Sequence, residues 1–177
     1  MAEKVIIIGG TAAGLSAASK AKRVDPSLEI TVFERSGYIS YGACGLPYFV
    51  GGIIDQPDDL VSLNVDQMTN QRGVPTFIHH EVTSIDRTAQ MVTVRDLDSG
   101  KSWQQPYDKL VIATGARAIV PDISGADAEG VYTLRTVEDG IRLKSTVQGG
   151  EHKAIAIVGG GCLLYTSDAA DDLTRVD

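Results

Sequence analysis

Apolar and polar residues along the first 34 positions follow a pattern that predicts a strand, a helix and a second strand. The unbroken run Lys4 to Ile8 (KVIII) has the β-branched composition of a buried parallel strand. Thr11 to Val24 is rich in Ala, Leu and Lys and predicts a helix, which Asp25-Pro26 ends. Leu28 to Glu34 (LEITVFE) predicts the second strand. Together they form a βαβ unit with an expected right-handed crossover.

The middle of the chain mainly predicts strands. Residues 35–48 have a loop-like composition, and Asn64 to Gly73 predicts a short helix with a glycine C-cap. The tight turn Asp98 to Gly100 indicates a β-hairpin. The expected strands are residues 74–85, 90–97 and 102–113, a strand at 109–115 ending in a small-residue turn, and a strand after Gly130 followed by a helix from about Thr136.

The last part of the chain repeats the opening pattern. Residues 153–160 (KAIAIVGG) resemble residues 4–10 (KVIIIGG), so Ala154 to Gly161 predicts the start of a second βα unit. Residues 162–177 lack the glycine and the helical pattern that would complete such a unit. The stretch CLLYTSDAADD also corresponds to one reading frame of a common transposon-based sequencing adapter. We therefore expect residues 162–177 to be a non-native tail; the alternative is an ordinary divergent C-terminus.

Composition and charge narrow the class of protein. The 177 residues are 43% hydrophobic and 22% charged, which is typical of a globular protein. An apolar run of about 18 residues is absent, and the N-terminal run leads into glycines, so we expect neither a transmembrane helix nor a signal peptide, and a cytoplasmic location. The net charge of −7, without a basic block, argues against nucleic acid and anionic membranes as partners. The two cysteines lack zinc spacing, and His79 and His80 would point to opposite faces of a strand, so no metal site is expected.

A glycine motif follows the first strand. In VIIIGGTAAG, Gly9 and Gly14 hold the outer positions and Thr11 the middle one. Gly9 would permit the sharp turn, Gly14 close packing of helix on strand, and the helix N-terminus would offer N–H groups to a pyrophosphate. Glu34, twenty residues past Gly14 at the end of the second strand, is placed to accept hydrogen bonds from a ribose diol. The pattern predicts a dinucleotide site; the alternative is a glycine turn without a ligand.

One cysteine lies in a segment of small residues. In SYGACGLPYFVGG (Ser40 to Gly52), Cys44 directly precedes a predicted short helix. The N-terminus of a helix stabilises a thiolate, which is a nucleophile toward disulfides and peroxides. Position 49 is Phe49, so Cys44 has no cysteine near it in sequence and would form a mixed disulfide or a sulfenic acid with an external molecule. The alternative is a buried cysteine that packs as a small hydrophobe.

These motifs, with ATGA at Ala113 to Ala116, resemble the pyridine nucleotide-disulfide oxidoreductases over roughly Lys4 to Gly161. The similarity is greater to the single-cysteine branch, which includes coenzyme A disulfide reductases, NADH oxidases, NADH peroxidases and polysulfide reductases. The resemblance implies an α/β fold. Residues 1–150 would form a Rossmann-like FAD-binding domain, a parallel sheet with a β-meander, that carries the redox cysteine. Residues 151–161 would begin an NAD(P)H-binding domain, with Gly159 and Gly161 at the NAD(P)H.

The resemblance also implies roles for individual residues. Cys44 would lie beside the flavin, and NAD(P)H would reduce the flavin, which would reduce a disulfide linked to the cysteine. Glu34 and Arg35 would hold the adenosine ribose, and Val82 would meet the adenine. The remaining FAD contacts would be Gly9, Gly10, Thr11, Ala12, Ala13 and Gly14 at the pyrophosphate, and Ala113, Thr114 and Gly115 closing over the cofactor.

Single positions favour one branch over another. NADH oxidases and peroxidases of this type carry a histidine where this chain has Ala12, which favours a coenzyme A disulfide reductase over an oxidase or peroxidase acting through a Cys44 sulfenic acid. Ala43 replaces a common asparagine, which leaves a polysulfide or persulfide substrate open. The coenzyme A contacts implied by the resemblance are Ser16, Lys20, Arg23 and Ser40, although the two charged residues could equally be plain solvated side chains.

Members of the branch are longer chains, and their full-length form is expected to be a homodimer. For these 177 residues alone, an inactive FAD- or ADP-binding module is the expected alternative. The choice between NADH and NADPH is left open by this sequence.

Overall fold

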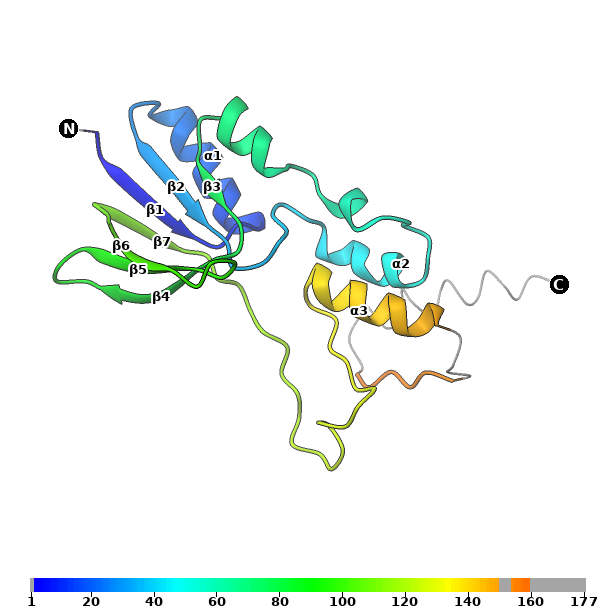
Figure 1. Ribbon diagram of the computed structural model, residues 1–177. Helices are drawn as coiled ribbons and strands as arrows, with labels where there is room; N and C mark the ends of the chain where they lie inside the picture. The colour runs from blue at the N-terminus through cyan, green and yellow to red at the C-terminus, as the bar shows by residue number, and fades with distance from the viewer. Residues whose placement is uncertain (1, 150–153, 160–177) are drawn as a thin grey trace. The chain divides into compact units, whose positions relative to one another are not determined.

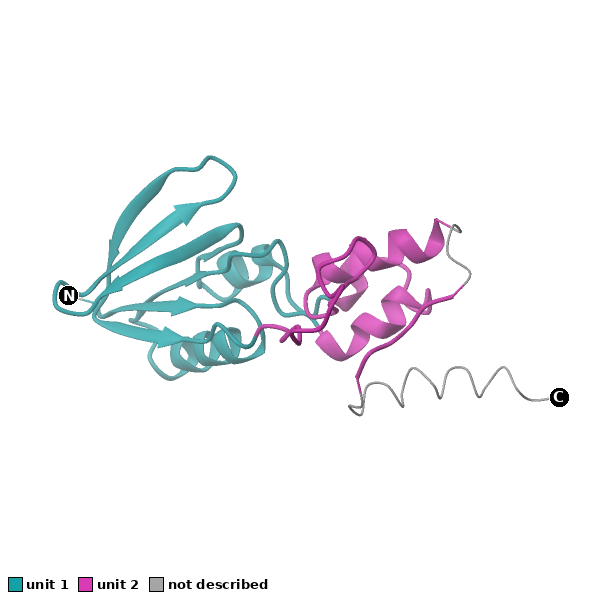
Figure 2. Ribbon diagram, turned by 90° about the horizontal axis from the view of Figure 1, so that it is seen from below, with its two compact units in different colours: residues 1–41, 61–116 teal, residues 42–60, 117–177 magenta. Residues whose placement is uncertain are grey.

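The computed structural model describes residues 2–149 and 154–159. The described residues form two compact units (Figure 2). The first unit consists of residues 1–41 and 61–116, and the second of residues 42–60 and the described part of 117–177. Each unit combines segments that are distant in sequence.

A four-stranded parallel sheet forms the centre of the first unit (Figure 1). Its order is β3 (Thr76–Phe77), β2 (Glu29–Phe33), β1 (Lys4–Ile8) and β7 (Lys109–Ile112). Helix α1 (Ala12–Val24) connects β1 to the parallel strand β2. The predicted βαβ unit is therefore confirmed, with element ends within one residue of the prediction.

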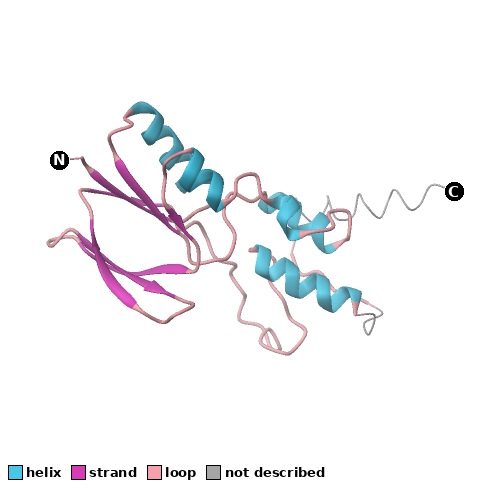
Figure 3. Cartoon of the chain, turned by 45° about the horizontal axis from the view of Figure 1, so that its top comes forward, coloured by secondary structure: helices cyan, strands magenta, loops and turns pink. Residues whose placement is uncertain are grey.

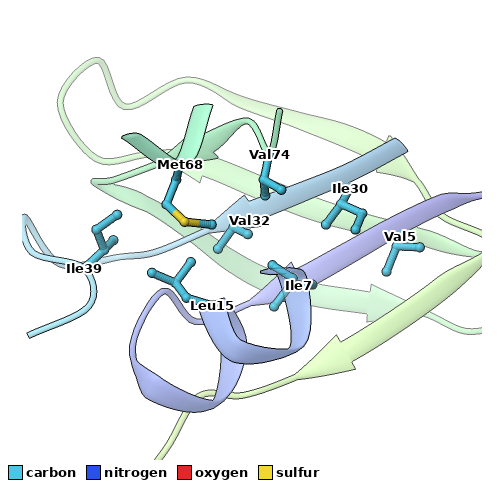
Figure 4. Close-up of a cluster of buried hydrophobic side chains, with 9 residues drawn as sticks. Val5, Ile7, Leu15, Ile30, Val32, Ile39, Met68 and Val74 are labelled. Atoms are coloured by element: carbon cyan, nitrogen blue, oxygen red, sulfur yellow. The ribbon is translucent and has the colours of Figure 1, made fainter. Parts of the chain in front are cut away.

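One side of this sheet packs against α1. Alternate residues of β1 and β2 point to this side, so the apolar runs supply side chains to it. Burying one such Val, Leu or Ile side chain contributes about 1.5–3 kcal/mol. Figure 4 shows the resulting cluster, which consists of Val5, Ile7, Leu15, Ala18, Ile30, Val32, Ile39, Met68 and Val74.

A three-stranded antiparallel sheet supplies a second apolar cluster. Its strands β4 (His80–Asp86), β5 (Met91–Asp96) and β6 (Ser102–Pro106) lie in sequence order. Figure 3 draws the strands of both sheets in magenta. Ile6 and Ile8 of β1 and Phe33 of β2 pack here, which explains why both strands read as almost continuous apolar runs. The cluster consists of Ile6, Ile8, Phe33, Val92, Val94 and Tyr107.

Two of the predicted strands are in fact broken, each between the two sheets. Residues 74–85 divide into β3 and β4, and His79 has a positive φ of 56° at the break. Residues 102–113 divide into β6 and β7 at Tyr107 and Asp108, whose N–H groups donate to carbonyls outside those strands. The chain has to leave one sheet and enter the other at these points, which a run of strand-forming residues does not reveal. The hairpin at Asp98 to Gly100 is present, with Gly100 at φ 73°.

The second unit contains short helices. They are η1 (Ala43–Gly45), α2 (Leu46–Val50), η2 (Pro57–Leu60) and α3 (Val137–Gln148). Helix α3 starts where predicted, because Thr136 and Asp139 form a capping box: the Thr136 hydroxyl accepts from the Asp139 N–H and the Asp139 carboxylate accepts from the Thr136 N–H. The predicted helix near residue 64–73 belongs to the first unit and is a π-helical turn, Gln67–Gln71 (labelled η3), with Gly73 at φ 64°.

Two expected strands are not formed among the described residues. Residues 131–134 and 154–158 pair with no strand in the described part of the chain, and their apolar side chains are exposed, including Ile155 and Val158. A strand requires a paired neighbour, and neither segment has one within residues 2–149 and 154–159. Gly161 and the expected tail, residues 162–177, lie outside the described residues. The helices in the described part are all too short or too polar to cross a membrane.

Candidate dinucleotide site and redox cysteine

The glycine turn after β1 has the geometry expected from its sequence. Gly9 has a φ of +109°, its N–H donates to the Phe33 carbonyl at 2.8 Å, and a Cβ there would overlap the Ala113 carbonyl. A Cβ on Gly14 would overlap the Gly9 carbonyl. Both positions therefore require glycine, the first because of its backbone conformation and its close neighbour, and the second because α1 lies directly against the turn.

Helix α1 begins directly after this turn. Thr11 is the N-cap residue, but its side chain makes no capping hydrogen bond, and Ala12 and Ala13 are exposed. The first N–H groups of a helix have no acceptor within it, and the helix dipole places partial positive charge there. Backbone donors and space are both available, so this end of the helix fits a pyrophosphate.

Glu34 is a buried acid, 8% exposed, at the carboxyl end of β2. Its Oε2 accepts from the Gly10 N–H at 2.6 Å, and its Oε1 accepts from the Ser36 N–H at 2.8 Å. The Ser36 hydroxyl lies 2.8 Å from Oε1 and 3.0 Å from the Tyr38 carbonyl, and its single proton can serve only one of them. A carboxylate has about four acceptor positions. The Gly10 and Ser36 N–H groups each occupy one of these positions, on different oxygens.

The carboxyl ends of three neighbouring strands bring the predicted nucleotide residues together. Gly9 follows β1, Glu34 follows β2, and Ala113 follows β7, where its N–H donates to the Ile8 carbonyl at 2.8 Å. This edge is where parallel α/β sheets bind ligands. Gly115 has a φ of 67° and Thr114 is exposed, so this turn is open on its outer side.

Arg35 and Val82 are the two other residues that the sequence predicts to contact the nucleotide. Arg35 follows Glu34 and is exposed. Val82 lies in β4, the edge strand of the antiparallel sheet, opposite Val94. An edge strand has backbone groups on its outer side that are not used within the sheet, which suits backbone recognition of a base.

Three of the predicted substrate residues share one exposed face of α1. Ser16, Lys20 and Arg23 are all exposed, at helical spacings of four and three. At 1.5 Å per residue, Arg23 lies about 10 Å further along the helix than Ser16. The fourth residue, Ser40, is placed at the glycine turn instead: its N–H donates to the Gly10 carbonyl at 3.0 Å. Ser40 has a φ of 49°, a rare conformation for a residue with a side chain.

Cys44 belongs to the second unit and is a free, exposed cysteine. It lies in η1, directly before α2, so the short helix expected after it is present. The turn is closed by two backbone bonds, from the Gly45 N–H to the Gly42 carbonyl and from the Gly42 N–H to the Leu60 carbonyl, each 2.9 Å. Its exposure contradicts the alternative interpretation of a buried hydrophobe and leaves the thiol accessible to a substrate.

Sequence reasoning missed several residues that hold these features in place. Ser36 binds the carboxylate of Glu34, and Ile39 packs against Gly10, where a Cβ would lie 2.7 Å from Ile39 Cγ2. Lys144 is a buried lysine on α3. For Ser36 the sequence offered one signal, a polar residue two positions after Glu34. For Ile39 and Lys144 it offered none. The described residues contain no group of three or more metal-ligating side chains.

Comparison with known proteins gives relatives that are named as reductases and oxidases. Coenzyme A disulfide reductase of Staphylococcus haemolyticus is 32% identical over 158 residues, covering 89% of this chain and 35% of the relative. The NAD(P)H coenzyme A polysulfide/persulfide reductase of Pyrococcus horikoshii is 36% identical over 161 residues, covering 91% and 35%. The chain thus spans about a third of the length of these curated relatives.

Solved structures agree with this result. Reduced CoADR-RHD of Bacillus anthracis matches with a TM-score of 0.80 and 32% identity, covering 84% of this chain and 27% of that one. The water-forming NADH oxidase of Lactobacillus brevis bound to NADH matches with a TM-score of 0.86 and 29% identity, covering 98% and 38%. A sequence model of the pyridine nucleotide-disulphide oxidoreductases matches residues 3–163. This chain belongs to the pyridine nucleotide-disulphide oxidoreductase family.

Proposed function

We propose that this chain is part of an FAD-dependent NAD(P)H oxidoreductase that reduces a disulfide through Cys44. The observation that carries the proposal is a free, exposed cysteine on a glycine-rich turn, in a chain whose first unit fits a dinucleotide. The family's enzymes use FAD and NAD(P)H. The substrate class we propose is coenzyme A disulfide or a related polysulfide or persulfide, as the names of two relatives suggest.

The first unit would hold the FAD. The N–H groups at the start of α1 would bind the pyrophosphate, and the close packing at Gly9 and Gly14 leaves the backbone accessible to it. Glu34 would accept hydrogen bonds from the ribose, Val82 would contact the adenine with its backbone, and the turn after Ile112 would close over the cofactor. Bound FAD would supply two-electron transfer from NAD(P)H. Gly159 and Gly161 stay proposed NAD(P)H contacts.

Cys44 would act as the nucleophile. Its thiolate attacks one sulfur of the substrate disulfide, forms a mixed disulfide and expels the other half as a thiolate, which takes a proton from water. Two electrons and a proton then cleave the mixed disulfide, release the second thiol and restore the Cys44 thiolate. Both products are thiols, and the cysteine ends in the state in which it began.

The exposed face of α1 supports coenzyme A as the carrier of the sulfur. Lys20 and Arg23 would attract its phosphates, with Ser16 on the same face. Ser40 would contribute from beside the glycine turn.

A second candidate is an NADH oxidase or peroxidase in which the Cys44 thiolate is oxidised to a sulfenic acid. The relative named NADH oxidase from Methanocaldococcus jannaschii, 32% identical, favours it. Ala12 counts against it, because a methyl group cannot transfer protons. For these 177 residues alone, an inactive FAD- or ADP-binding module is a further alternative. A homodimeric full-length form, a cytoplasmic location, and the absence of nucleic-acid and membrane partners stay predictions from the sequence.

The first half-reaction tests the proposal directly, because it needs only Cys44 and a disulfide. Coenzyme A disulfide is added to the Cys162→Ser variant under anaerobic conditions, and released thiol and protein mass are measured. We expect one equivalent of thiol per chain and a mass increase of one coenzyme A. The Cys44→Ser, Cys162→Ser double variant should release none. Equal release from both variants, or oxidation by peroxide with no reaction toward the disulfide, would overturn the proposal.

A further inference from the structure

Lys144 is a buried cation in the second unit. Its residue is 8% exposed, and its Nζ donates to the carbonyl oxygens of Asp55 at 2.7 Å and Ile54 at 3.1 Å. The same ammonium lies 4.2 Å from the centroid of the Phe49 ring. Lysine is rarely buried unless its donors are satisfied. Here two carbonyls and an aromatic face take up the three donor directions.

The partners of Lys144 come from α2 and from the loop after it. Phe49 lies within α2, and the Ile54 N–H donates to the carbonyl of Tyr48, also in α2, at 3.1 Å. Ile54 is therefore fixed at its N–H by α2 and at its carbonyl by α3. Gly140, one turn before Lys144, lets α3 lie close to α2, because a Cβ on Gly140 would lie 3.2 Å from the Phe49 ring.

The same loop presses on the backbone beside Cys44. Gly45 directly follows Cys44, and a Cβ on Gly45 would lie 2.6 Å from Leu60 Cδ2 and 3.4 Å from Ile54 Cδ1. The Lys144 ammonium thus binds the carbonyl of Ile54, and the side chain of Ile54 lies beside Gly45. All of these residues lie within the second unit.

The turn that carries Cys44 cannot hold itself in place. It consists of three residues of η1 and five of α2, and a helix this short is unstable without tertiary contacts. The thiol side is exposed, so the support has to come from the other side. Lys144 of the longer helix α3 reaches α2 through the Phe49 ring and the loop after α2 through two carbonyls.

We propose that Lys144 is a positioning residue for Cys44. By anchoring the Ile54 carbonyl it restricts local opening of the turn and fixes the direction in which the thiol projects. The link to turnover rests on the proposed function, since attack on a disulfide needs an aligned approach of sulfur to sulfur. The effect on local opening does not depend on it.

Amide hydrogen exchange tests the positioning role. In a Cys162→Ser background, Lys144→Met keeps the length of the side chain and removes its donors. We expect exchange protection at the Gly45 and Ile54 amides to fall about tenfold or more, because charge-assisted hydrogen bonds that oppose opening are lost. Protection at the Val32 amide, in the core of the first unit, should not change. Arg142→Met removes a largely exposed charge from the same helix and should leave all three amides unchanged.

Two further measurements keep the proposal open to refutation. Lys144→Arg retains charge and donors and should restore most of the protection. The ratio of the rate with coenzyme A disulfide to the rate of alkylation by iodoacetamide should fall several-fold in Lys144→Met. The small alkylating agent can approach the thiolate from many directions, whereas the large disulfide can approach only where it fits beside the turn. Unchanged protection at Gly45 in Lys144→Met would overturn the positioning role. Lys144→Met could instead lower exchange protection throughout the chain. In that case the Ile54→Val variant must lower protection at the Gly45 amide and at no amide of the first unit. If Ile54→Val leaves the Gly45 amide unchanged, the positioning role is also overturned. A wild-type Cys44 inert to disulfides would instead overturn the proposed function.

Discussion

The two units of this protein hold their functional groups in different ways. In the first unit the glycine turn and Glu34 are set at the ends of strands that are buried on both faces, so the core itself fixes the backbone. In the second unit Cys44 lies on a short turn that is held by single contacts, such as the Lys144 hydrogen bonds and the approach of Leu60 to Gly45. We conclude that changes in the first unit should act through overall stability, whereas changes in the second should act locally.

The strongest test of this contrast compares two glycines with positive φ. Gly9→Ala combines a conformation that alanine avoids with an overlap on the Ala113 carbonyl, so we expect a loss of about 3 kcal/mol or more. Gly52 in the second unit has a φ of 80° but nothing within 4 Å of a Cβ, so Gly52→Ala should cost only about 1 kcal/mol. Urea unfolding, followed by the fluorescence of Trp103 and by circular dichroism, measures both. Equal losses would show that packing at the turn is not tight.

A smaller effect is expected at Glu34. Glu34→Gln removes a carboxylate that accepts from the Gly10 and Ser36 N–H groups, and the resulting mismatch should cost about 1–3 kcal/mol. ADP binding, measured by titration calorimetry, should weaken about tenfold if this residue holds the ribose. Glu29→Gln, at the exposed start of the same strand, is the matched control and should change neither quantity. Normal ADP affinity in Glu34→Gln would remove this residue from the proposed cofactor site.

The second unit offers a test of local behaviour at the start of α3. Thr136→Ala deletes the side chain that accepts from the Asp139 N–H, which should cost about 1 kcal/mol. The loss should appear as faster exchange of the Gly140 amide, which donates to the Thr136 carbonyl, with no change in the Trp103 transition. Thr133→Ala, exposed and outside the helix, serves as the control. A shift of the Trp103 transition in Thr136→Ala would contradict a local effect.

The smallest expected effect concerns pH at the hairpin of the first unit. Hydrogen bonds from the Ser99 hydroxyl, the Ser99 N–H and the Asp98 N–H lower the pKa of Asp96 below its usual value. A lowered pKa stabilises the fold above the ordinary aspartate value, and this contribution is lost as the pH falls through the lowered pKa. The urea midpoint of Asp96→Asn should therefore be lower than that of the wild type at neutral pH. The two midpoints should converge in strong acid, below the lowered pKa. Parallel curves at all pH values would exclude the contribution.

Local patterns were sufficient wherever a feature depends on neighbours in sequence. The buried strands at Lys4 and Leu28, the glycine requirement at Gly9 and Gly14, and the start of α3 at Thr136 all follow from apolar periodicity, backbone sterics and capping. The same patterns placed residues 74–85 in one strand, although His79 breaks it. Periodicity reports which residues are buried in a strand but not which sheet receives them.

The sequence by itself determined the βαβ unit, the glycine turn, the acid that ends the second strand and the place of Cys44 ahead of a short helix. Only the tertiary structure decided that Ser36 shares the Glu34 carboxylate and that Lys144 anchors the turn carrying Cys44. Lys144 and Ile54 are 90 positions apart in the chain. A buried lysine on a helix looks in sequence like any solvated charge, because its acceptors are backbone carbonyls, which every residue carries and no side-chain pattern reveals.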